Sequence, residues 1–205
     1  MRIKMNESDK MVSLSEYVDQ NTCISAVVPE NTSCFFKESG TTHRITAIQG
    51  IMRDHVNPNC KKETLYPEDV YDVIPGDQYI GIRVTLTIQY KYVDDYHEDE
   101  EYVFEISDER DCCEIWGSFL SEDDLSRYIG AELLDIYFTD TSLNTEYVQK
   151  IASYKTRSDY HNVQFVNFKT NRGVFQFTVY NCHNGYYGHD VSLTYNGDEV
   201  YKTQI

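Results

Sequence analysis

The chain alternates apolar and polar residues most regularly between Tyr79 and Val93, in the stretch YIGIRVTLTIQYKYV. One face of this stretch carries apolar side chains: Ile80, Ile82, Val84, Leu86 and Ile88. The other face carries polar side chains: Arg83, Thr85, Thr87 and Gln89. Successive side chains of a strand point to opposite sides, so this pattern predicts a strand with one buried face. The alternation in EYVFEISD, residues 101–108, predicts its return strand across an acidic turn, DDYHEDEE, at residues 94–101.

Further segments with the same period lie on both sides of this hairpin. They are HRITAIQGI at 43–51, ELLDIYFTD at 132–140, HNVQFVNFKT at 161–170, NRGVFQFTVYNC at 171–182 and HDVSLTYNG at 189–197. The last three are joined by short polar turns, as in a chain that folds back on itself. We therefore expect an antiparallel meander at the end of the chain.

One segment, SEDDLSRYIG, has the signals of a helix rather than a strand. Ser121 suits the N-cap position, and Asp124 at the third helical position can return a hydrogen bond to it. The acidic residues of this first turn also suit the positive end of a helix dipole, and Gly130 suits the helix end. We therefore expect an α+β fold, with an antiparallel sheet of about six or seven strands and one main helix at 121–129.

The regular pattern is missing from the N-terminal part of the chain. Residues 1–37 carry no sustained period, and we expect them to form an arm that packs on the domain or is partly ordered. We expect residues 38–205 to form a single α+β domain, since a chain of 205 residues fits one domain. Inside that domain, residues 52–78 predict a long loop, which holds three of the four prolines.

Negative charge is concentrated in one part of the chain. The formal charge is −16, and residues 94–124 hold fourteen acidic residues and one basic residue, Arg110. A field of this sign repels nucleic-acid phosphates and anionic lipids, and it attracts basic surfaces. We therefore expect no direct contact with nucleic acid or membrane, and a protein partner with a basic surface.

The sequence lacks the features of an exported or membrane-spanning chain. It has no apolar run of the roughly 18–20 residues that cross a bilayer, and it does not start with the apolar block of a signal peptide. These observations favour a cytoplasmic location. The six cysteines form no CxxC pair, and in that compartment they are expected to be free thiols.

The stretch DCCEIW places two adjacent cysteines, Cys112 and Cys113, between Asp111 and Glu114 and close to the only tryptophan, Trp116. In an extended segment the two thiols point to opposite sides, so they make a poor chelate for one metal ion. One interpretation is a buried thiol packed beside the tryptophan, since a free cysteine behaves as a small hydrophobe. The neighbouring carboxylates disfavour a thiolate, which argues against a nucleophilic cysteine.

A second interpretation of this stretch is a zinc site made with distant partners. In that case Cys113 would join Cys182 together with His183 or His189. The ligand spacing typical of structural zinc sites is missing from the chain. We therefore expect neither a metal nor another cofactor.

The acidic turn supplies a candidate interaction surface of six carboxylates: Asp94, Asp95, Glu98, Asp99, Glu100 and Glu101. One interpretation is a solvated hairpin tip, whose charge protects a sheet edge from aggregation. A second is a docking surface for a basic protein. A third is a cation site, although the turn lacks the glycine that helps oxygen ligands to surround calcium.

A second candidate binding element is the stretch NGYY. Asn184 and Gly185 form a strong turn pair, and the side chains of Tyr186 and Tyr187 would then point to opposite faces. One interpretation is a hairpin with one core tyrosine. The alternative is an exposed tyrosine that contacts a ligand or a partner. In that case DCCE and the helix that begins at Ser121 would line one pocket with this turn.

Four motifs occur in a fixed order: DCCE at 111–114, DDLSRYIG at 123–130, VQFVNFKTNRGVFQFTVY at 163–180 and NGYY at 184–187. With these motifs, the region 79–195 resembles a family of small uncharacterised domains found in phages, bacteria and large DNA viruses. The resemblance implies a small α+β domain and a viral genome, and it implies no activity. The chain departs from the family pattern at Ser107–Arg110 and in its long region 1–78.

The sequence shows no motif of a known enzyme class. It has no serine elbow, no HExxH and no glycine-rich phosphate loop. Our leading hypothesis is a non-enzymatic, virus-encoded interaction protein of the host cytoplasm. It would bind a host or viral protein through its acidic, tyrosine-bearing surface by electrostatic steering and aromatic anchoring. The alternatives are a small-ligand-binding module, with a pocket between the NGYY hairpin and the helix, and a metal-dependent enzyme. Host, partner and oligomeric state stay open.

Overall fold

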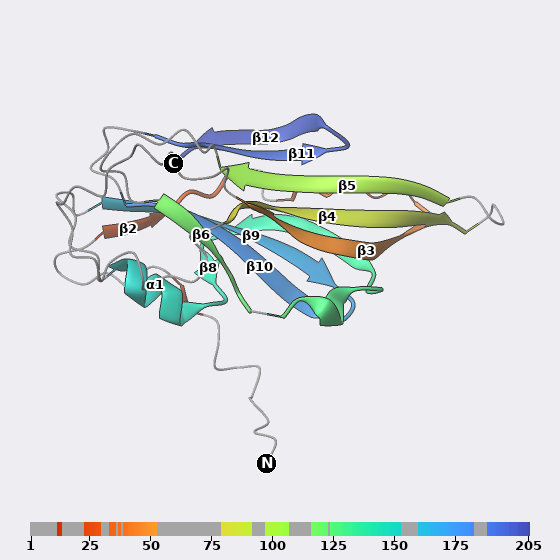
Figure 1. Ribbon diagram of the computed structural model, residues 1–205, viewed down its shortest axis with the longest axis horizontal. Coiled ribbons are helices and arrows are strands. Elements are labelled where there is room, and N and C mark those ends of the chain that lie inside the picture. Colours follow the sequence, from red (N-terminus) through yellow and green to blue (C-terminus); the bar gives the residue numbers. More distant parts are fainter. Residues whose placement is uncertain are drawn as a thin grey trace, which may run out of the picture.

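Two β-sheets lie face to face in the computed structural model (Figure 1). The structure describes residues 12–13, 23–29, 33–35, 37, 39–52, 79–91, 97–106, 116–122, 124–152, 160–182 and 188–205. The first sheet is antiparallel, with the strand order β12-β11-β5-β4-β3. Its strands are β3 (Thr41–Met52), β4 (Tyr79–Tyr90), β5 (His97–Ile106), β11 (Asp190–Tyr195) and β12 (Asp198–Gln204).

The second sheet has the order β2-β9-β10-β6, and β7 pairs with β9 beside that path. Its strands are β2 (Cys23–Ala26), β6 (Trp116–Leu120), β7 (Leu133–Thr139), β9 (Tyr160–Thr170) and β10 (Gly173–Asn181). All of its pairings are antiparallel except that of β2 with the start of β9. Two short strands, β1 (Val12–Ser13) and β8 (Thr141–Ser142), pair separately.

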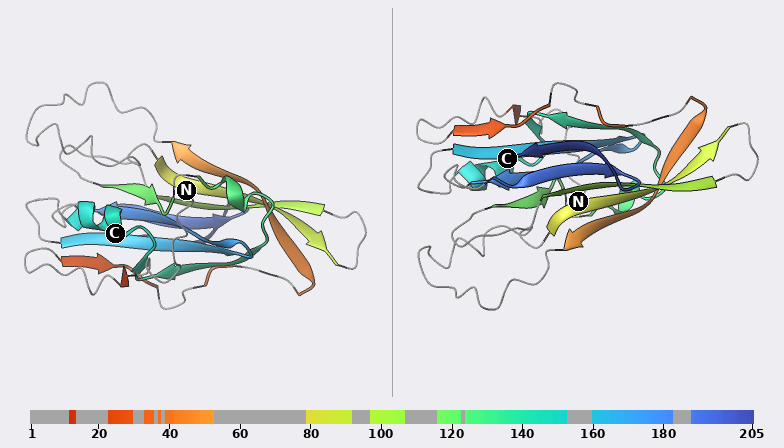
Figure 2. Two further views of the ribbon diagram at one scale, coloured as in Figure 1. Left: turned by 90° about the horizontal axis from the view of Figure 1, so that it is seen from below. Right: turned by 90° about the horizontal axis from the view of Figure 1, so that it is seen from above.

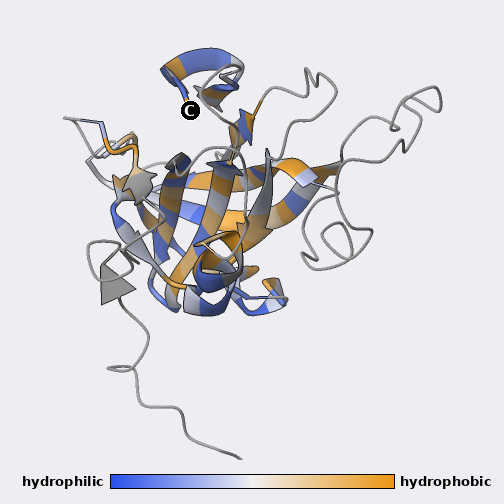
Figure 3. Ribbon diagram, turned by 90° about the vertical axis from the view of Figure 1, so that its left-hand side faces the viewer, coloured by the Kyte–Doolittle hydropathy of each residue, from blue (hydrophilic) through white to orange (hydrophobic). Residues whose placement is uncertain are grey.

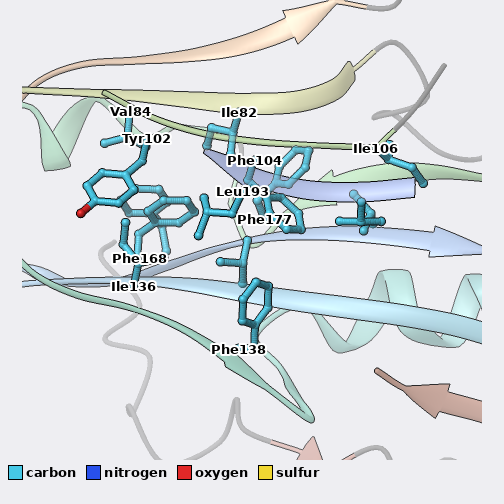
Figure 4. Close-up of a cluster of buried hydrophobic side chains, with 14 of the residues drawn as sticks. Ile82, Val84, Tyr102, Phe104, Ile106, Ile136, Phe138, Phe168, Phe177 and Leu193 are labelled. Atoms are coloured by element: carbon cyan, nitrogen blue, oxygen red, sulfur yellow. The ribbon is translucent and has the colours of Figure 1, made fainter. Parts of the chain in front are cut away.

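The main hydrophobic core fills the space between the two sheets (Figure 4). The first sheet contributes, among others, Ile82, Val84, Tyr102, Phe104 and Leu193. The second sheet contributes, among others, Ile136, Phe138, Phe168, Phe175 and Phe177. Each such side chain, when fully buried, stabilises the fold by roughly 1.5–3 kcal/mol. The core is therefore the interface of a β-sandwich.

A helix covers part of the outer face of the second sheet. The helix α1 (Thr145–Ala152) begins after Asn144, whose Oδ1 accepts a hydrogen bond from the Tyr147 backbone N–H at 3.3 Å. Val148 and Ile151 of this helix pack in a second core, formed with Phe119, Val163, Phe165, Tyr180 and Cys182. Strands β9 and β10 are therefore buried on both faces.

The strand predictions in the regions 43–51, 79–93, 101–108 and 132–140 are confirmed by β3, β4, β5 and β7. Along the strands, hydrophobic and hydrophilic residues alternate as the pattern requires (Figure 3). The predicted hairpin is also confirmed, because β4 and β5 pair antiparallel. Its acidic turn is shorter than predicted, since β5 begins at His97 and residues 97–101 belong to the strand.

The predicted α+β class is wrong, because the described chain is mostly β and the predicted main helix at 121–129 does not form. Only a short 3₁₀ turn, Ser126–Tyr128, occurs there. The backbone N–H of Ser121 donates to the Gln176 carbonyl at 2.9 Å, and the Ser121 hydroxyl accepts from the Gln176 N–H at 3.0 Å. Ser121 thus extends the pairing of β6 with β10, and Asp124 instead accepts a hydrogen bond from the Ser126 backbone N–H at 2.9 Å.

The predicted C-terminal meander is correct only for β9 and β10, which pair antiparallel. After β10 the chain crosses to the other sheet, where β11 pairs with β5 and with β12. Strand β12 was not predicted from the sequence. A two-residue turn, Asn196 and Gly197, joins β11 to β12, and both residues have positive φ, 50° and 85°.

The two sheets do not end at the same place. The ends of β3, β4 and β5 extend beyond the second sheet on one side (Figures 1 and 2).

From the N-terminal part, Cys34 and Phe35 pack against the main core, and the Cys34 backbone N–H donates to the Ile136 carbonyl at 2.8 Å.

Candidate functional site

A groove opens at one edge of the sandwich, where β3 ends the first sheet and β6 ends the second. The Ser118 hydroxyl of β6 donates to the Tyr79 carbonyl of β4 at 2.8 Å, so the two sheets approach each other there. The cavity has a volume of about 370 Å³. Its lining is mostly apolar and comes from both sheets and the 3₁₀ turn: Ile48, Gly50, Tyr79, Gly81, Ile82, Leu120, Leu125, Ser126, Ile129 and Phe177.

Two glycines permit close packing in the part of the first sheet that lines this groove. A Cβ atom on Gly50 would lie 2.4 Å from two ring atoms of Tyr79, so the phenol ring lies directly on the β3 backbone. A Cβ atom on Gly81 would lie 2.5 Å from the carbonyl oxygen of Phe104 in the neighbouring strand. Glycine at these positions therefore permits a close packing that a larger residue would disturb.

Residues 124–130 form the opposite wall, which is held by the buried side chain of Tyr128. Its hydroxyl lies 2.8 Å from Glu122 Oε1 and 2.9 Å from the Val174 carbonyl oxygen, and it donates its proton to these acceptors. Arg127 donates to Glu122 at 2.9 Å and also contacts the Tyr128 hydroxyl. Burial raises the pKa of Tyr128, and the Arg127 hydrogen bond opposes that rise. The hydroxyl therefore stays protonated at neutral pH.

Arg172 fixes the end of the same wall. Its guanidinium donates to the carbonyl oxygens of Arg127, Ile129 and Gly130 at 3.0, 2.8 and 3.2 Å. Gly130 has a φ of +78°, which glycine adopts without strain. Its backbone N–H donates to the Ile45 carbonyl at 2.8 Å and so joins the wall to the edge strand β3.

A second group of polar side chains lies inside the sandwich, beneath the extended ends of β3 and β5. His43 Nδ1 lies 3.7 Å from a carboxylate oxygen of Glu100, and the Tyr195 hydroxyl donates to the other oxygen. The second ring nitrogen of His43 lies 3.0 Å from the Thr41 hydroxyl. Glu100 faces inward because it stands opposite Leu86, a member of the buried face of β4.

Aromatic rings pack around this polar cluster. Phe35 packs edge-on against the His43 ring at 5.1 Å, and Tyr102 stacks on Tyr195 at 4.8 Å between centroids. His43 is 2 % exposed and Glu100 is 8 % exposed. An imidazole, a carboxylate and a phenol are suited to proton transfer, but a dissolved substrate does not reach the first two at such burial.

Among the predicted site residues, the structure places Trp116 inside the core. It is 1 % exposed, and its ring centroid lies 4.6 Å from that of His189. Trp116 also stands opposite Asn181 in the pairing of β6 with β10. The described segments that flank the two predicted binding motifs therefore contact each other. The motifs themselves, Asp111–Glu114 and Asn184–Tyr187, lie outside the described residues.

The acidic candidates do not form one exposed group. Asp94 and Asp95 lie outside the described residues, and for Glu98 only the backbone in β5 is described. Asp99 is exposed and accepts a hydrogen bond from the Thr87 hydroxyl at 2.8 Å. Glu101 pairs with Arg83 at 3.4 Å on the outer face of the sheet. Glu100 is excluded from this surface because it is buried with His43.

The cysteines that the structure describes show no reactive environment. Burial, with a smaller contribution from Asp135, raises the pKa of Cys34 to about 11. Burial also raises the pKa of Cys182, which lies in the second core. Within the described ranges, no group of three or more His, Cys, Asp or Glu side chains could hold a metal ion. Cys113 and His183 of the zinc alternative lie outside those ranges.

Neither the groove nor the buried polar cluster was predicted from the sequence. The groove draws on β3, β4, β6, β10 and the 3₁₀ turn, and no local motif relates such distant segments. Glycines inside the apolar strand patterns, Gly50 and Gly81, were a usable signal, because an interior glycine marks a close approach. Continuing the alternation of the return strand back to residue 100 would have shown that Glu100 shares a face with Tyr102 and Phe104.

Comparison with known proteins adds a family but no activity. The family model described as Domain of unknown function (DUF7448) matches residues 80–193. This range runs from β4 to β11 and includes both predicted binding motifs. The chain has no match among curated proteins and none among solved structures. No helix in the described part of the chain is long and apolar enough to cross a membrane.

Proposed function

The chain belongs to this family of domains of unknown function, and we propose that it is a non-enzymatic module that binds a small molecule in the groove between its two sheets. One observation carries the proposal: side chains from both sheets and from a fixed wall segment surround a cavity of about 370 Å³. Small-molecule sites are concave, mostly apolar and largely preformed, with volumes of about 300–1,000 Å³.

The chemistry of the lining supports binding rather than catalysis. Tyr79 is the ionisable side chain in that lining, and the remaining side chains are apolar apart from the Ser126 hydroxyl. Acid–base catalysis needs a titratable group within hydrogen-bond reach of the substrate. A carboxylate and an imidazole do lie close to each other, in Glu100 and His43, but both side chains are buried elsewhere in the sandwich.

This proposal moves the pocket away from the place that the sequence suggested. The groove adjoins residues 124–130, and the rest of its described lining comes from β3, β4, β6 and β10 rather than from the NGYY turn. Docking of a basic protein on the acidic surface stays a prediction. Its electrostatic basis is reduced by the burial of Glu100 and by the pairing of Glu101 with Arg83. We keep the virus-encoded origin and the cytoplasmic location as parts of the proposal.

A fragment screen with two matched variants tests the proposal. Ile129 lines the groove and is 41 % exposed, whereas Leu134 on β7 is 38 % exposed and is not among the lining residues. Ile129→Asp therefore places a carboxylate at the groove, and Leu134→Asp places one elsewhere at similar exposure. Saturation-transfer NMR of an uncharged fragment library would be recorded on the wild-type protein and on both variants.

We expect a set of fragments that bind the wild-type protein and Leu134→Asp but bind Ile129→Asp at least about tenfold more weakly, since a carboxylate there must be desolvated. Circular dichroism would confirm that both variants are folded. The proposal fails if no fragment binds the wild-type protein, or if both variants lose binding equally.

A further inference from the structure

We infer that the groove selects a planar, uncharged aromatic ligand. This inference rests on the proposed function, because it names the class of molecule that the same groove would hold. It is carried by the Tyr79 ring, which lies on the β3 backbone at Gly50, and by a described lining that contains no charged side chain.

An aromatic ring forms part of the wall that β3 and β4 give to the groove. The Tyr79 ring lies against the β3 backbone at Gly50, beside the side chains of Ile48 and Ile82. A planar aromatic ligand can stack on this ring in an offset arrangement. A saturated ligand of equal carbon number would lack that ring contact.

The charges next to the groove are engaged by the protein itself. Glu122 accepts from Arg127 and from Tyr128, and the guanidinium of Arg172 is bonded to three carbonyl oxygens. Arg44 donates to the Gly130 carbonyl at 3.1 Å. Asp124, one residue before Leu125, accepts from the backbone N–H of Ser126 at 2.9 Å.

The described lining of the groove contains no charged side chain, so a charged ligand would lose its hydration there without contacting an opposite charge. Transfer of an unpaired ion into an apolar site is far more costly than transfer of a neutral group. The hydroxyls of Tyr79 and Ser126 are the polar side-chain groups in the lining, so a neutral hydroxyl or amide on the ligand has partners there.

A series of compounds on one ring system separates these properties. The probes are 2-naphthalenemethanol, 2-naphthoate and 2-naphthylmethylammonium, measured at pH 7, where the acid is ionised and the amine is protonated. The fully saturated decahydronaphthalene-2-methanol tests planarity. Titrations would follow the ¹³C methyl signals of Ile48, Ile82 and Ile129 in the wild-type protein. Ile151, under helix α1, serves as a control at a distant site.

We expect the neutral aromatic alcohol to bind at least about tenfold more tightly than either ion, which corresponds to about 1.4 kcal/mol. We expect the saturated alcohol to be several-fold weaker, and the shifts to be confined to the three groove isoleucines. If an ion or the saturated alcohol binds the groove as tightly as the aromatic alcohol, the inference is wrong and the proposed function stands. If neither these probes nor any library fragment shifts the groove methyl signals, the proposed function fails, and the inference fails with it.

Discussion

The groove and the polar cluster differ in what they leave open. The groove is a cavity of about 370 Å³ with apolar walls, next to which the described charges are paired within the protein. The cluster of His43, Glu100 and Tyr195 is rich in titratable groups, but its carboxylate and imidazole are almost fully buried. The groove is thus open to a ligand but has no charged side chain in its described lining. The cluster has an imidazole and a carboxylate, but a dissolved ligand does not reach them.

This difference predicts that the cluster contributes to the stability of the fold, whereas the groove contributes to binding. Buried polar groups have to be paired, and once paired they fix the strands that carry them. His43, Glu100 and Tyr195 lie on β3, β5 and β11, so the cluster connects three strands of the first sheet. We expect substitutions in the cluster to change the free energy of unfolding and substitutions along the groove to change binding.

The largest effect is expected for Glu100→Ala. The change removes the acceptor of the Tyr195 hydroxyl and the carboxylate next to His43, and each buried polar group that loses its partner in this way costs about 1–3 kcal/mol. Glu101→Ala is the matched control, since Glu101 is the next residue, is 41 % exposed and pairs with Arg83. Its loss should cost less than about 1 kcal/mol. Urea unfolding of both variants measures the difference, and equal costs would mean that Glu100 has no special role in the interior.

The contrast between Glu100 and Glu101 also shows how far the sequence could predict this molecule. Alternation along one strand determines which side chains share a face, and it correctly predicted the inner face of β4. It does not determine which strands become neighbours, because strand order depends on contacts between distant segments. For that reason β11 was predicted beside β10, whereas it pairs with β5 and β12.

Local helix signals failed at 121–129 for a related reason. Ser121 and Asp124 do make the polar contacts that their side chains favour, but Ser121 makes them with Gln176 of β10. The helix that does form, α1, begins after Asn144, and Val148 and Ile151 lie on its buried face. The turn at Asn196 and Gly197 was the clearest signal left unused, since Asn-Gly predicts a two-residue hairpin and therefore β12.

A smaller effect is expected for Tyr128→Phe, which removes the hydroxyl that anchors the groove wall. The change removes a donor from the Glu122 carboxylate and from the carbonyl of the half-buried Val174, and a hydrogen bond to a charged group contributes about 1.5–3 kcal/mol. Tyr137→Phe on β7, at a half-buried site, should change stability by less than about 0.5 kcal/mol. Denaturant unfolding compares the two variants. If both behave like the wild-type protein, the Tyr128 hydroxyl does not hold the wall.

A local effect is expected for Arg172→Met, which removes the guanidinium from three carbonyl oxygens of the wall. We expect a loss of about 1–2 kcal/mol, at the lower end for charged hydrogen bonds because the side chain is exposed. Hydrogen exchange should accelerate at the amides of Gly130 and Ala131, which bond to Ile45 and Tyr128. Arg83→Met, which breaks an exposed pair with Glu101, should leave these amides unchanged. Unchanged exchange in Arg172→Met would show that other contacts maintain the wall.

The smallest effect is expected from the titration of Tyr128. Burial raises its pKa above the ordinary value of 10.0, so the folded protein holds this proton more tightly than the unfolded chain. The resulting stabilisation is fully present below pH 10, and it is lost as the pH rises through the folded-state pKa. As the pH rises above 10, the wild-type protein should therefore lose stability slightly more steeply than Tyr128→Phe. Urea unfolding across that range measures both slopes, and identical slopes would mean that the Tyr128 hydroxyl titrates as it does in water.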